Sequence, residues 1–510
     1  SSTIQAEDAP RPNLLVILVD DMGYSDLGCY GSEIETPHLD GLANKGLRFT
    51  GFYNAARCCP TRASLLTGLY PHQAGVGKMV SAGDTGKPGP YQGYLNKQCR
   101  TLAEVLKPAG YDCYLSGKWH VGETLPNWPV SRGFDHSYGL ISGGMNYYDI
   151  TKGKRPGIKR VFARDDKAIV PEPGAFYATD AFTDAAIAYF NQNEESGNPF
   201  LLYLGYTAPH WPLHAPELLI RKWEARYLKD WETFREERHK RQIELGIIRA
   251  DTPLSPTDAA DWHAMDEEQK KTMARKMATY AAMIEQMDQG IGRIVDELRK
   301  SERLSNTLIL FLSDNGACAE GGLFGSNFRK DLTGPIGTVD SYHNYGQSWS
   351  NLSNTPLRRH KSHTHEGGIL TPAIIHWPAG LKRSPGSIDH NTVAHVIDVL
   401  PTFAELAGAP LPQGRDSNLT PLPGQSLVPV LTAAHTLSTQ SRTLGWEHIG
   451  AAAWREGSMK LVRAKPKEKW ELYDLREDPL EMNNLAAHRP EVVQRMAAAW
   501  EKWAADIGVR

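Results

Sequence analysis

The stretch NLLVILVDD, residues 13–21, is an apolar run that ends in two aspartates. A short, continuous apolar run is typical of a strand buried on both faces of a sheet. Similar runs occupy residues 110–116, 199–206, 306–313 and 372–378, with helical patterns around them. The clearest helix spans 272–301, where apolar side chains recur every three or four residues. This alternation predicts an α/β fold with a large, mostly parallel mixed β-sheet flanked by helices.

The length of the chain and a change in its character indicate two domains. A chain of 510 residues exceeds what one hydrophobic core usually serves. After a proline-rich passage at 409–425, short patterns typical of antiparallel strands lead to a terminal helix at 491–507. We therefore predict a large domain over residues 1–430 and a smaller α+β domain with an antiparallel sheet over 431–510. The charged, poorly periodic stretch 222–262 is interpreted as a surface insertion.

Composition excludes several classes of partner. The net charge of −3 gives no reason to expect nucleic acid, and no apolar run is long enough to span a membrane. The six cysteines show neither metal-type spacing nor the density of a disulfide framework. The polar start of the chain is interpreted as the end of a mature protein that has lost a signal peptide, which predicts a secreted or periplasmic location.

Polar side chains follow four of the predicted strands where each strand ends. Ligands of open α/β sheets bind outside the carboxyl ends of the strands. A single aspartate or histidine after a strand is more often a turn, capping or structural residue, but four strands deliver such groups to one predicted edge. These groups are Asp20, Asp21, Lys118, His120, His210, Asp314 and Asn315.

The acids and the amide in this group form an all-oxygen donor set. Such donors suit a hard cation, Ca²⁺ or, less well, Mg²⁺, and disfavour zinc. Lysine and histidine next to such a cation would create a site for an anionic centre such as sulfate or phosphate.

The segment CCPTRASLLTG, residues 58–68, has the features of a helix start. Pro60 suits the first turn, so Cys58 is expected at the amino end, where free N–H groups favour an anion. Arg62 follows four residues later and can reach the same side, where its guanidinium suits a tetrahedral oxyanion. Two adjacent cysteines could also be small buried hydrophobic residues.

Taken with these features, the sequence resembles the formylglycine-dependent (type I, arylsulfatase-like) sulfatases of the alkaline phosphatase superfamily. CCPTRASLLTG matches their signature C-x-P-[ST]-R-x-x-x-L-T-G. NLLVILVDDMGYSDLGCYG, GYDCYLSGKWHVG, YTAPHWPLHAP, LFLSDNGA, NTPLRRHKSHTHEGGILTP and ELYDLREDPLEMNNLA are similar to further motifs of that family, in the same order. The resemblance covers nearly the whole chain and implies an alkaline phosphatase/sulfatase-like fold.

The resemblance implies specific roles for these residues. Cys58 would be converted to Cα-formylglycine by a formylglycine-generating or anaerobic sulfatase-maturating enzyme, while Cys59 is a spacer. Asp20, Asp21, Asp314 and Asn315 would bind Ca²⁺. The groups around the formylglycine and the sulfate would be Arg62, Lys118, His120, His210 and Lys361, of which Lys361 is assigned only through the motif NTPLRRHKSHTHEGG.

The implied activity is hydrolysis of a carbohydrate or aryl sulfate monoester to an alcohol and inorganic sulfate. One hydroxyl of the hydrated aldehyde would attack sulfur and form a sulfo-enzyme intermediate, and the second would then expel sulfate. His210 would protonate the leaving oxygen, and His120 would act on the formylglycine hydroxyl. Trp211 and His214 would either contact the leaving group or serve in packing.

Other functions remain open at this point. One is hydrolysis of a phosphate or phosphonate monoester by the same kind of site, and another is a catalytically silent sugar-binding protein. The loops at 143–156 and 323–351 are rich in aromatic and polar residues, and we expect them to form the rim of the substrate site.

Overall fold

The computed structural model describes residues 11–80, 87–153, 160–412, 418–433 and 442–509. The polar start of the chain at residues 1–10, and residues 154–156 of the first rim loop, lie outside these ranges. Among the described residues, every helix is either too short or too polar to span a lipid bilayer.

A large mixed sheet forms the centre of the fold and confirms the predicted fold class. Its strand order is β10-β2-β9-β8-β1-β7-β3-β4-β5-β6, with β11 pairing to β2. The neighbours of β1 run parallel to it on both sides, whereas β9 runs antiparallel to β8 and to β2. The strands are β1 (Asn13–Asp20), β2 (Leu47–Tyr53), β3 (Asp112–Gly117), β4 (His136–Leu140), β5 (Phe162–Arg164), β6 (Lys167–Ile169), β7 (Phe200–Pro209), β8 (Thr307–Ser313), β9 (Leu370–His376), β10 (Ser387–Asp389) and β11 (Ala394–His395).

Strand β1 separates two hydrophobic cores. Successive side chains of a strand point to opposite faces of the sheet. Leu15, Ile17 and Val19 lie in one core, and the intervening Leu14, Val16 and Leu18 lie in the other. Every apolar side chain of the run is therefore buried, as the sequence predicted.

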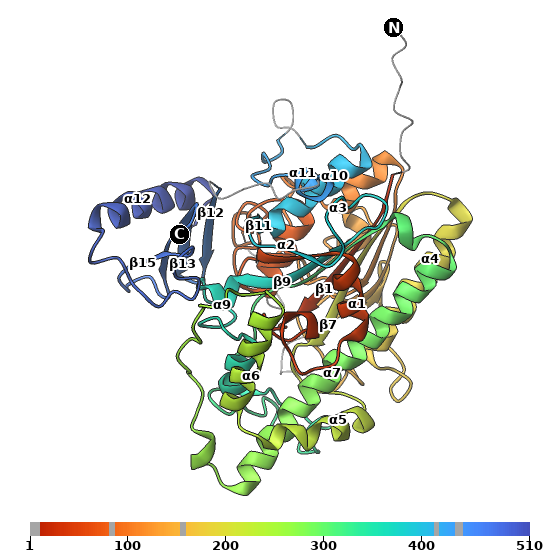
Figure 1. Ribbon diagram of the computed structural model, residues 1–510. Helices are drawn as coiled ribbons and strands as arrows, with labels where there is room; N and C mark the ends of the chain where they lie inside the picture. The colour runs from red at the N-terminus through yellow and green to blue at the C-terminus, as the bar shows by residue number, and fades with distance from the viewer. Residues whose placement is uncertain (1–10, 81–86, 154–159, 413–417, 434–441, 510) are drawn as a thin grey trace.

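Helices cover both faces of the sheet (Figure 1). Helices α1 (Pro37–Lys45), α4 (Ala178–Ser196) and α7 (Glu267–Lys300) pack in one core, and α2 (Cys58–Thr67), α3 (Leu102–Leu106) and α10 (Val399–Ala407) pack in the other. Helix α7 confirms the helix predicted at 272–301; it begins earlier because Asp266 and Gln269 form a capping box. The remaining helices are α5 (Glu217–Glu224), α6 (Trp231–Glu244), α8 (Gly346–Ser353), α9 (Glu366–Ile369), α11 (Val428–Thr432) and α12 (Pro490–Asp506).

The interpretation of residues 222–262 as a surface insertion is wrong in part. Helix α6 in this segment buries Trp231, Phe234 and two arginines. Arg238 forms ion pairs with Asp26 at 2.7 Å and Glu33 at 2.7 Å, close to the end of β1. Part of the charge of the segment, at Arg238, thus belongs to buried ion pairs, which a hydrophobic pattern does not reveal.

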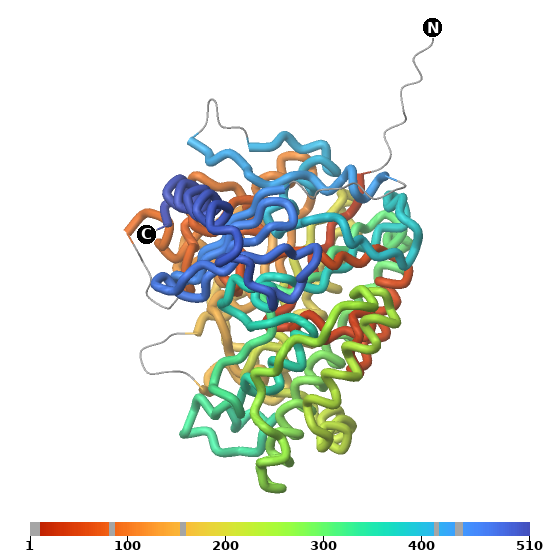
Figure 2. The backbone as a smooth tube through the Cα atoms, turned by 60° about the vertical axis from the view of Figure 1, so that its left-hand side comes forward, coloured from red at the N-terminus to blue at the C-terminus, as the bar shows by residue number. Residues whose placement is uncertain are grey.

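The C-terminal segment forms a separate antiparallel sheet in the order β12-β13-β14-β15. Its strands are β12 (Thr443–His448), β13 (Ala451–Glu456), β14 (Met459–Arg463) and β15 (Glu471–Asp474). Helix α12 packs on this sheet through Met496 and Trp500. Figure 2 draws this segment in blue, and its Trp446 and Arg455 donate to Asn54 and Tyr53 at the end of β2. The domain boundary at residue 430 stays a prediction.

Candidate active site

The predicted site residues meet where β1, β3, β7 and β8 end, next to the start of α2. Because β1 is parallel to β7 and β8, and β3 is parallel to β7, their carboxyl ends share one edge of the sheet. None of the predicted residues is more than 9% exposed. They are Asp20, Asp21, Cys58, Arg62, Lys118, His120, His210, Asp314, Asn315 and Lys361. Their catalytic and metal-binding roles stay predictions.

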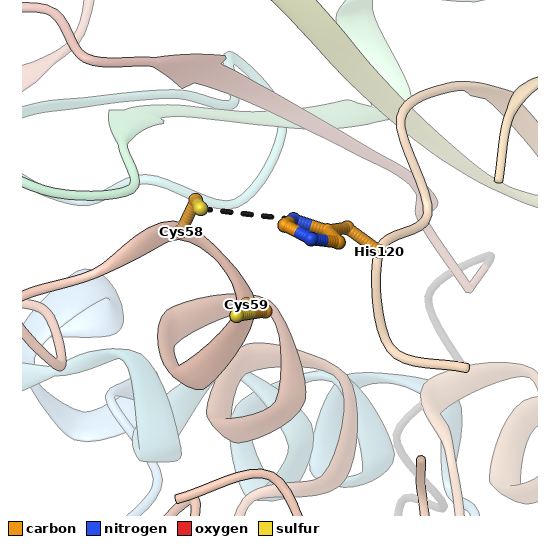
Figure 3. A group of neighbouring side chains, drawn as sticks. All are labelled: Cys58, Cys59 and His120. Carbon is orange, nitrogen blue, oxygen red and sulfur yellow. Dashed lines mark hydrogen bonds between the residues drawn. The ribbon is translucent and has the colours of Figure 1, made fainter. Parts of the chain in front are cut away.

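Cys58 is the first residue of α2, and Arg57 before it is extended. Its Sγ lies 3.6 Å from Nδ1 of His120, which comes from the segment after β3 (Figure 3). The other ring nitrogen of His120 is 3.3 Å from the carbonyl oxygen of Val80. His120 has a φ of 56°, and such left-handed non-glycine residues often occur at functional sites.

The surroundings of Cys58 favour a negative charge at its sulfur. A hydrogen bond from Cys59, together with the charges of Lys118 and His120, outweighs burial and holds the pKa of Cys58 well below its ordinary value. The thiol of Cys59, by contrast, accepts a hydrogen bond from the backbone N–H of Val80 at 3.2 Å and contacts Met79. Burial raises the pKa of Cys59 well above its ordinary value, so the two cysteines have different environments.

Asp20, Asp21, Asp314 and Asn315 converge in a cradle of oxygen atoms. Asp21 follows directly after β1 and has a φ of 67°. Its side chain therefore does not follow the alternation of the strand and can lie on the same side as that of Asp20. The Asn315 amide donates to Oδ1 of Asp21 at 2.8 Å. Two buried oxygens of this cradle, Oδ1 of Asp20 and Oδ1 of Asn315, have no partner among the described residues.

This cradle fits a hard divalent cation. Buried polar atoms normally have partners, so the two unpartnered oxygens point to a ligand. Burial and the charge of Asp20 raise the pKa of Asp314 well above its ordinary value. A bound cation would stabilise the ionised carboxylates, and the all-oxygen donor set matches Ca²⁺ or Mg²⁺.

Arg62 connects the helix to the cradle. Its Nη2 donates to Oδ2 of Asp314 at 2.8 Å, and its Nη1 donates to the carbonyl oxygen of Lys118 at 3.0 Å. The hydroxyl of Tyr203, on β7, lies 3.3 Å from the same Nη1. Arg62 is fully buried, so its charge acts in a medium that screens it weakly.

Two lysines and a histidine complete the ring of basic groups. Nζ of Lys118 donates to Asp20 at 2.5 Å, and Nζ of Lys361 lies 2.7 Å from Asp21. Nε2 of His210 is 3.5 Å from Asp21, and Nδ1 of His210 hydrogen-bonds the carbonyl oxygen of Trp211. The structure therefore brings Lys361, which spacing did not reveal, to the same acids as the strand-end residues.

The sequence did not single out Phe328, Glu320 or Arg57, which lie around Trp211 and one another at the rim of this site. The Trp211 ring stacks on Phe328 with centroids 4.4 Å apart, and its Nε1 donates to Glu320 at 2.8 Å. Glu320 also pairs with Arg57 at 3.0 Å, and the charge of Lys361 lowers the pKa of Glu320 to about 2. Phe328 belongs to the predicted rim loop at 323–351, whereas Glu320 and Arg57 gave no signal beyond their closeness to motifs.

His214 has the contacts of a packing residue. It accepts a hydrogen bond from the backbone N–H of Tyr147 at 3.3 Å and donates to the carbonyl oxygen of Ser341 at 2.9 Å. Both ring nitrogens are thus used within the protein. Of the two open interpretations of His214, the contacts favour packing.

Comparison with known proteins agrees with this geometry. The sulfatase family model matches residues 12–409, and the model described as N-sulphoglucosamine sulphohydrolase, C-terminal, matches residues 359–504. An uncharacterized sulfatase of Schizosaccharomyces pombe is 36% identical over 538 residues, covering 99% of this chain and 95% of that protein. The arylsulfatase of Klebsiella aerogenes is 37% identical over 414 residues, covering 79% of this chain and 88% of that protein.

A solved structure extends the similarity to the whole fold. Ps i-CgsB, determined in complex with k-i-k-neocarrahexaose, has a TM-score of 0.71 and 26% identity to this chain. The superposition covers 97% of this chain and 93% of that one. Together with the family match over most of the chain, these relationships show that the protein belongs to the sulfatase family and is a sulfuric ester hydrolase.

Proposed function

We propose that this enzyme hydrolyses the sulfate monoester of a carbohydrate or aryl alcohol, with Cys58 converted to formylglycine as the source of the nucleophile. The observation that carries the proposal is the position of Cys58. Cys58 is the first residue of α2, and its Sγ lies 3.6 Å from Nδ1 of His120. The charges of Lys118 and Arg62, which are buried in the same cluster, act on its sulfur. A formylglycine at this position supplies, as its hydrate, one hydroxyl that attacks sulfur and a second that allows sulfate to be released.

The basic groups would hold the sulfate and oppose its charge. Arg62 would act through its charge, since its Nε, Nη1 and Nη2 already donate to Asp314 and to the carbonyl oxygen of Lys118, and Lys118 and Lys361 present point charges. All three are at most 6% exposed, so little water screens them. Ca²⁺, held by Asp20, Asp21, Asp314 and Asn315, would supply further positive charge to the sulfate oxygens.

The two histidines would move protons at opposite ends of the reaction. Nδ1 of His120 faces Cys58 and is placed to exchange a proton with the hydroxyl of the nucleophile. In His210, Nδ1 faces the carbonyl oxygen of Trp211 and Nε2 faces Asp21, so both nitrogens can carry hydrogen. A hydrogen on Nε2 of His210 is placed to pass to the leaving alcohol oxygen.

The leaving group would stack on the rim next to His210. The ring centroid of Trp211 lies 5.1 Å from that of His210 and 4.4 Å from that of Phe328. These rings give an aromatic surface directly beside the proposed acid. Aromatic faces suit both sugar and aryl rings. The names of the relatives include both classes, an arylsulfatase and a protein solved with a neocarrahexaose.

Sulfate release from matched esters tests the proposal. The enzyme is produced together with a formylglycine-generating enzyme and assayed on 4-nitrophenyl sulfate, 4-nitrophenyl phosphate and a panel of sulfated sugars. We expect preference for sulfate over phosphate, and loss of activity in Cys58→Ala. Cys59→Ala is the matched control and should retain activity, because conversion of Cys58 to formylglycine removes the thiol that Cys59 hydrogen-bonds. A preference for phosphate, or equal activity of Cys58→Ala and Cys59→Ala, would contradict the proposal.

A further inference from the structure

The end of strand β12 brings a histidine of the C-terminal sheet toward the start of α2. Trp446, on this strand, donates from Nε1 to the carbonyl oxygen of Asn54 at 2.8 Å. His448 lies two residues further along and therefore on the same face of the strand as Trp446. The neighbouring Glu447 pairs with His72 at 2.7 Å, so the strand end is held against the segments before and after α2.

His448 is buried without using either ring nitrogen. It is 1% exposed, and neither Nδ1 nor Nε2 has a hydrogen-bond partner among the residues that the structure describes. Burying a polar group without a partner destabilises a protein, so a group of this kind needs an explanation. His214, equally buried, bonds through both nitrogens, which shows that the fold can satisfy a packing histidine.

The charges that act on His448 include two groups of the active site, Cys58 and Lys361. Arg57, Cys58, His72 and Lys361 all act electrostatically on its ring. Burial, reinforced by the charge of Arg57, lowers the pKa of His448 to about 3. The imidazole is therefore neutral at physiological pH, with one nitrogen as a donor and the other as an acceptor.

We propose that His448 is a specificity-determining residue that hydrogen-bonds a hydroxyl group of the alcohol that carries the sulfate. A sulfate oxygen can only accept, whereas a hydroxyl donates and accepts, which matches a neutral imidazole with both nitrogens free. Trp446 and Glu447 hold this strand end beside α2, and the charges of Cys58 and Lys361 act on the ring, so the hydroxyl would lie close to the ester. The inference rests on the proposed function and narrows it from carbohydrate or aryl sulfates to hydroxylated, sugar-like sulfates.

Substrates with and without such hydroxyls test the inference. Wild type, His448→Phe and His448→Gln are assayed on 4-nitrophenyl sulfate, which has no hydroxyl group, and on galactose and glucose monosulfates. The matched control is His376→Phe, because His376 is also buried with an unpartnered Nδ1 but ends β9 beside the start of β8, at the opposite edge of the sheet. Thermal unfolding of each variant reports on folding separately.

We expect His448→Phe to lower kcat/KM for the best sugar sulfate by about 10- to 100-fold, because a lost hydrogen bond to a substrate hydroxyl weakens discrimination. In the same variant, kcat/KM for 4-nitrophenyl sulfate should change by less than about threefold. His448→Gln should recover part of the loss on the sugar sulfate, and His376→Phe should leave kcat/KM unchanged on both substrates. Equal losses on both substrate types, no loss on the sugar, or a wild type that cleaves only 4-nitrophenyl sulfate would overturn the inference while leaving sulfatase activity in place. A properly matured wild type without activity on any sulfate ester would instead refute the proposed function itself.

Discussion

A single methyl group at Gly143 should displace the histidine that faces the nucleophile. Gly143 lies three residues after β4, and a Cβ built there would be 2.6 Å from both Cε1 and Nε2 of the His120 ring. Its φ lies outside the left-handed region, so alanine is compatible with the backbone. The substitution Gly143→Ala therefore acts through contact with His120 rather than through backbone strain.

The size of the effect can be worked out from this contact. Carbon atoms pack at roughly 3.5–4.0 Å, so the ring must move by about 1 Å unless the loop gives way. A displacement of about 1 Å at a reacting group costs on the order of 100-fold in rate, or about 2.7 kcal/mol in the barrier. Overpacking of this kind also costs about 1–3 kcal/mol of stability.

Gly144→Ala is the matched control for this experiment. A Cβ at Gly144 would lie 3.7 Å from Cε1 of His210, which is an ordinary contact. Steady-state kinetics on 4-nitrophenyl sulfate, with thermal unfolding in parallel, should show a loss of kcat of about 100-fold in Gly143→Ala and less than about threefold in Gly144→Ala. A wild-type kcat in Gly143→Ala, or a larger loss in Gly144→Ala, would refute the assigned position and role of His120.

Three further predictions concern the charges of the site and its support. Arg62→Lys keeps a positive charge but loses the fork that holds Asp314 and the carbonyl oxygen of Lys118, so kcat/KM on 4-nitrophenyl sulfate should fall about 10²- to 10³-fold; a loss under tenfold would argue against a role of these two contacts in positioning the site. Removing divalent cations with a chelator should lower both activity and the unfolding temperature, because the cradle carboxylates then repel one another, and Ca²⁺ should restore both; an unchanged unfolding temperature would speak against a resident cation. Lys460 is fully buried between Glu366 at 2.6 Å and Glu481 at 2.8 Å, so Lys460→Met should lower the free energy of unfolding by about 3–5 kcal/mol in urea titrations. The exposed Lys465 is its control, and similar midpoints for Lys460→Met and Lys465→Met would contradict this account.

The sequence was sufficient to predict the central strands and the polar residues at their ends. A strand buried on both faces must be apolar throughout, so runs such as the one before Asp20 stand out from their composition alone. Parallel strands also place their ends at one edge, which is why Lys118 and Asp314 could be grouped before their contacts were known. The helix start at Cys58 was predicted in the same way, from Pro60 and the apolar residues after it.

Residues whose position depends on long-range packing could not be predicted. Lys361 lies in an irregular segment before α9, so only the resemblance to the family placed it next to Asp21. Arg238 belongs to a helix whose buried ion pairs look like solvent-exposed charges in the sequence. His448 comes under the charge of Cys58 because the C-terminal sheet packs against the segment before α2, which no local pattern encodes.

The modification state of Cys58 tests the central claim most directly. Peptide mass spectrometry measures the fraction of chains with an aldehyde in place of the Cys58 thiol, in preparations made with graded amounts of formylglycine-generating enzyme. The account predicts that the rate of sulfate release is proportional to this fraction and vanishes when all chains carry the thiol. Full activity from chains that retain an unmodified Cys58 would contradict it.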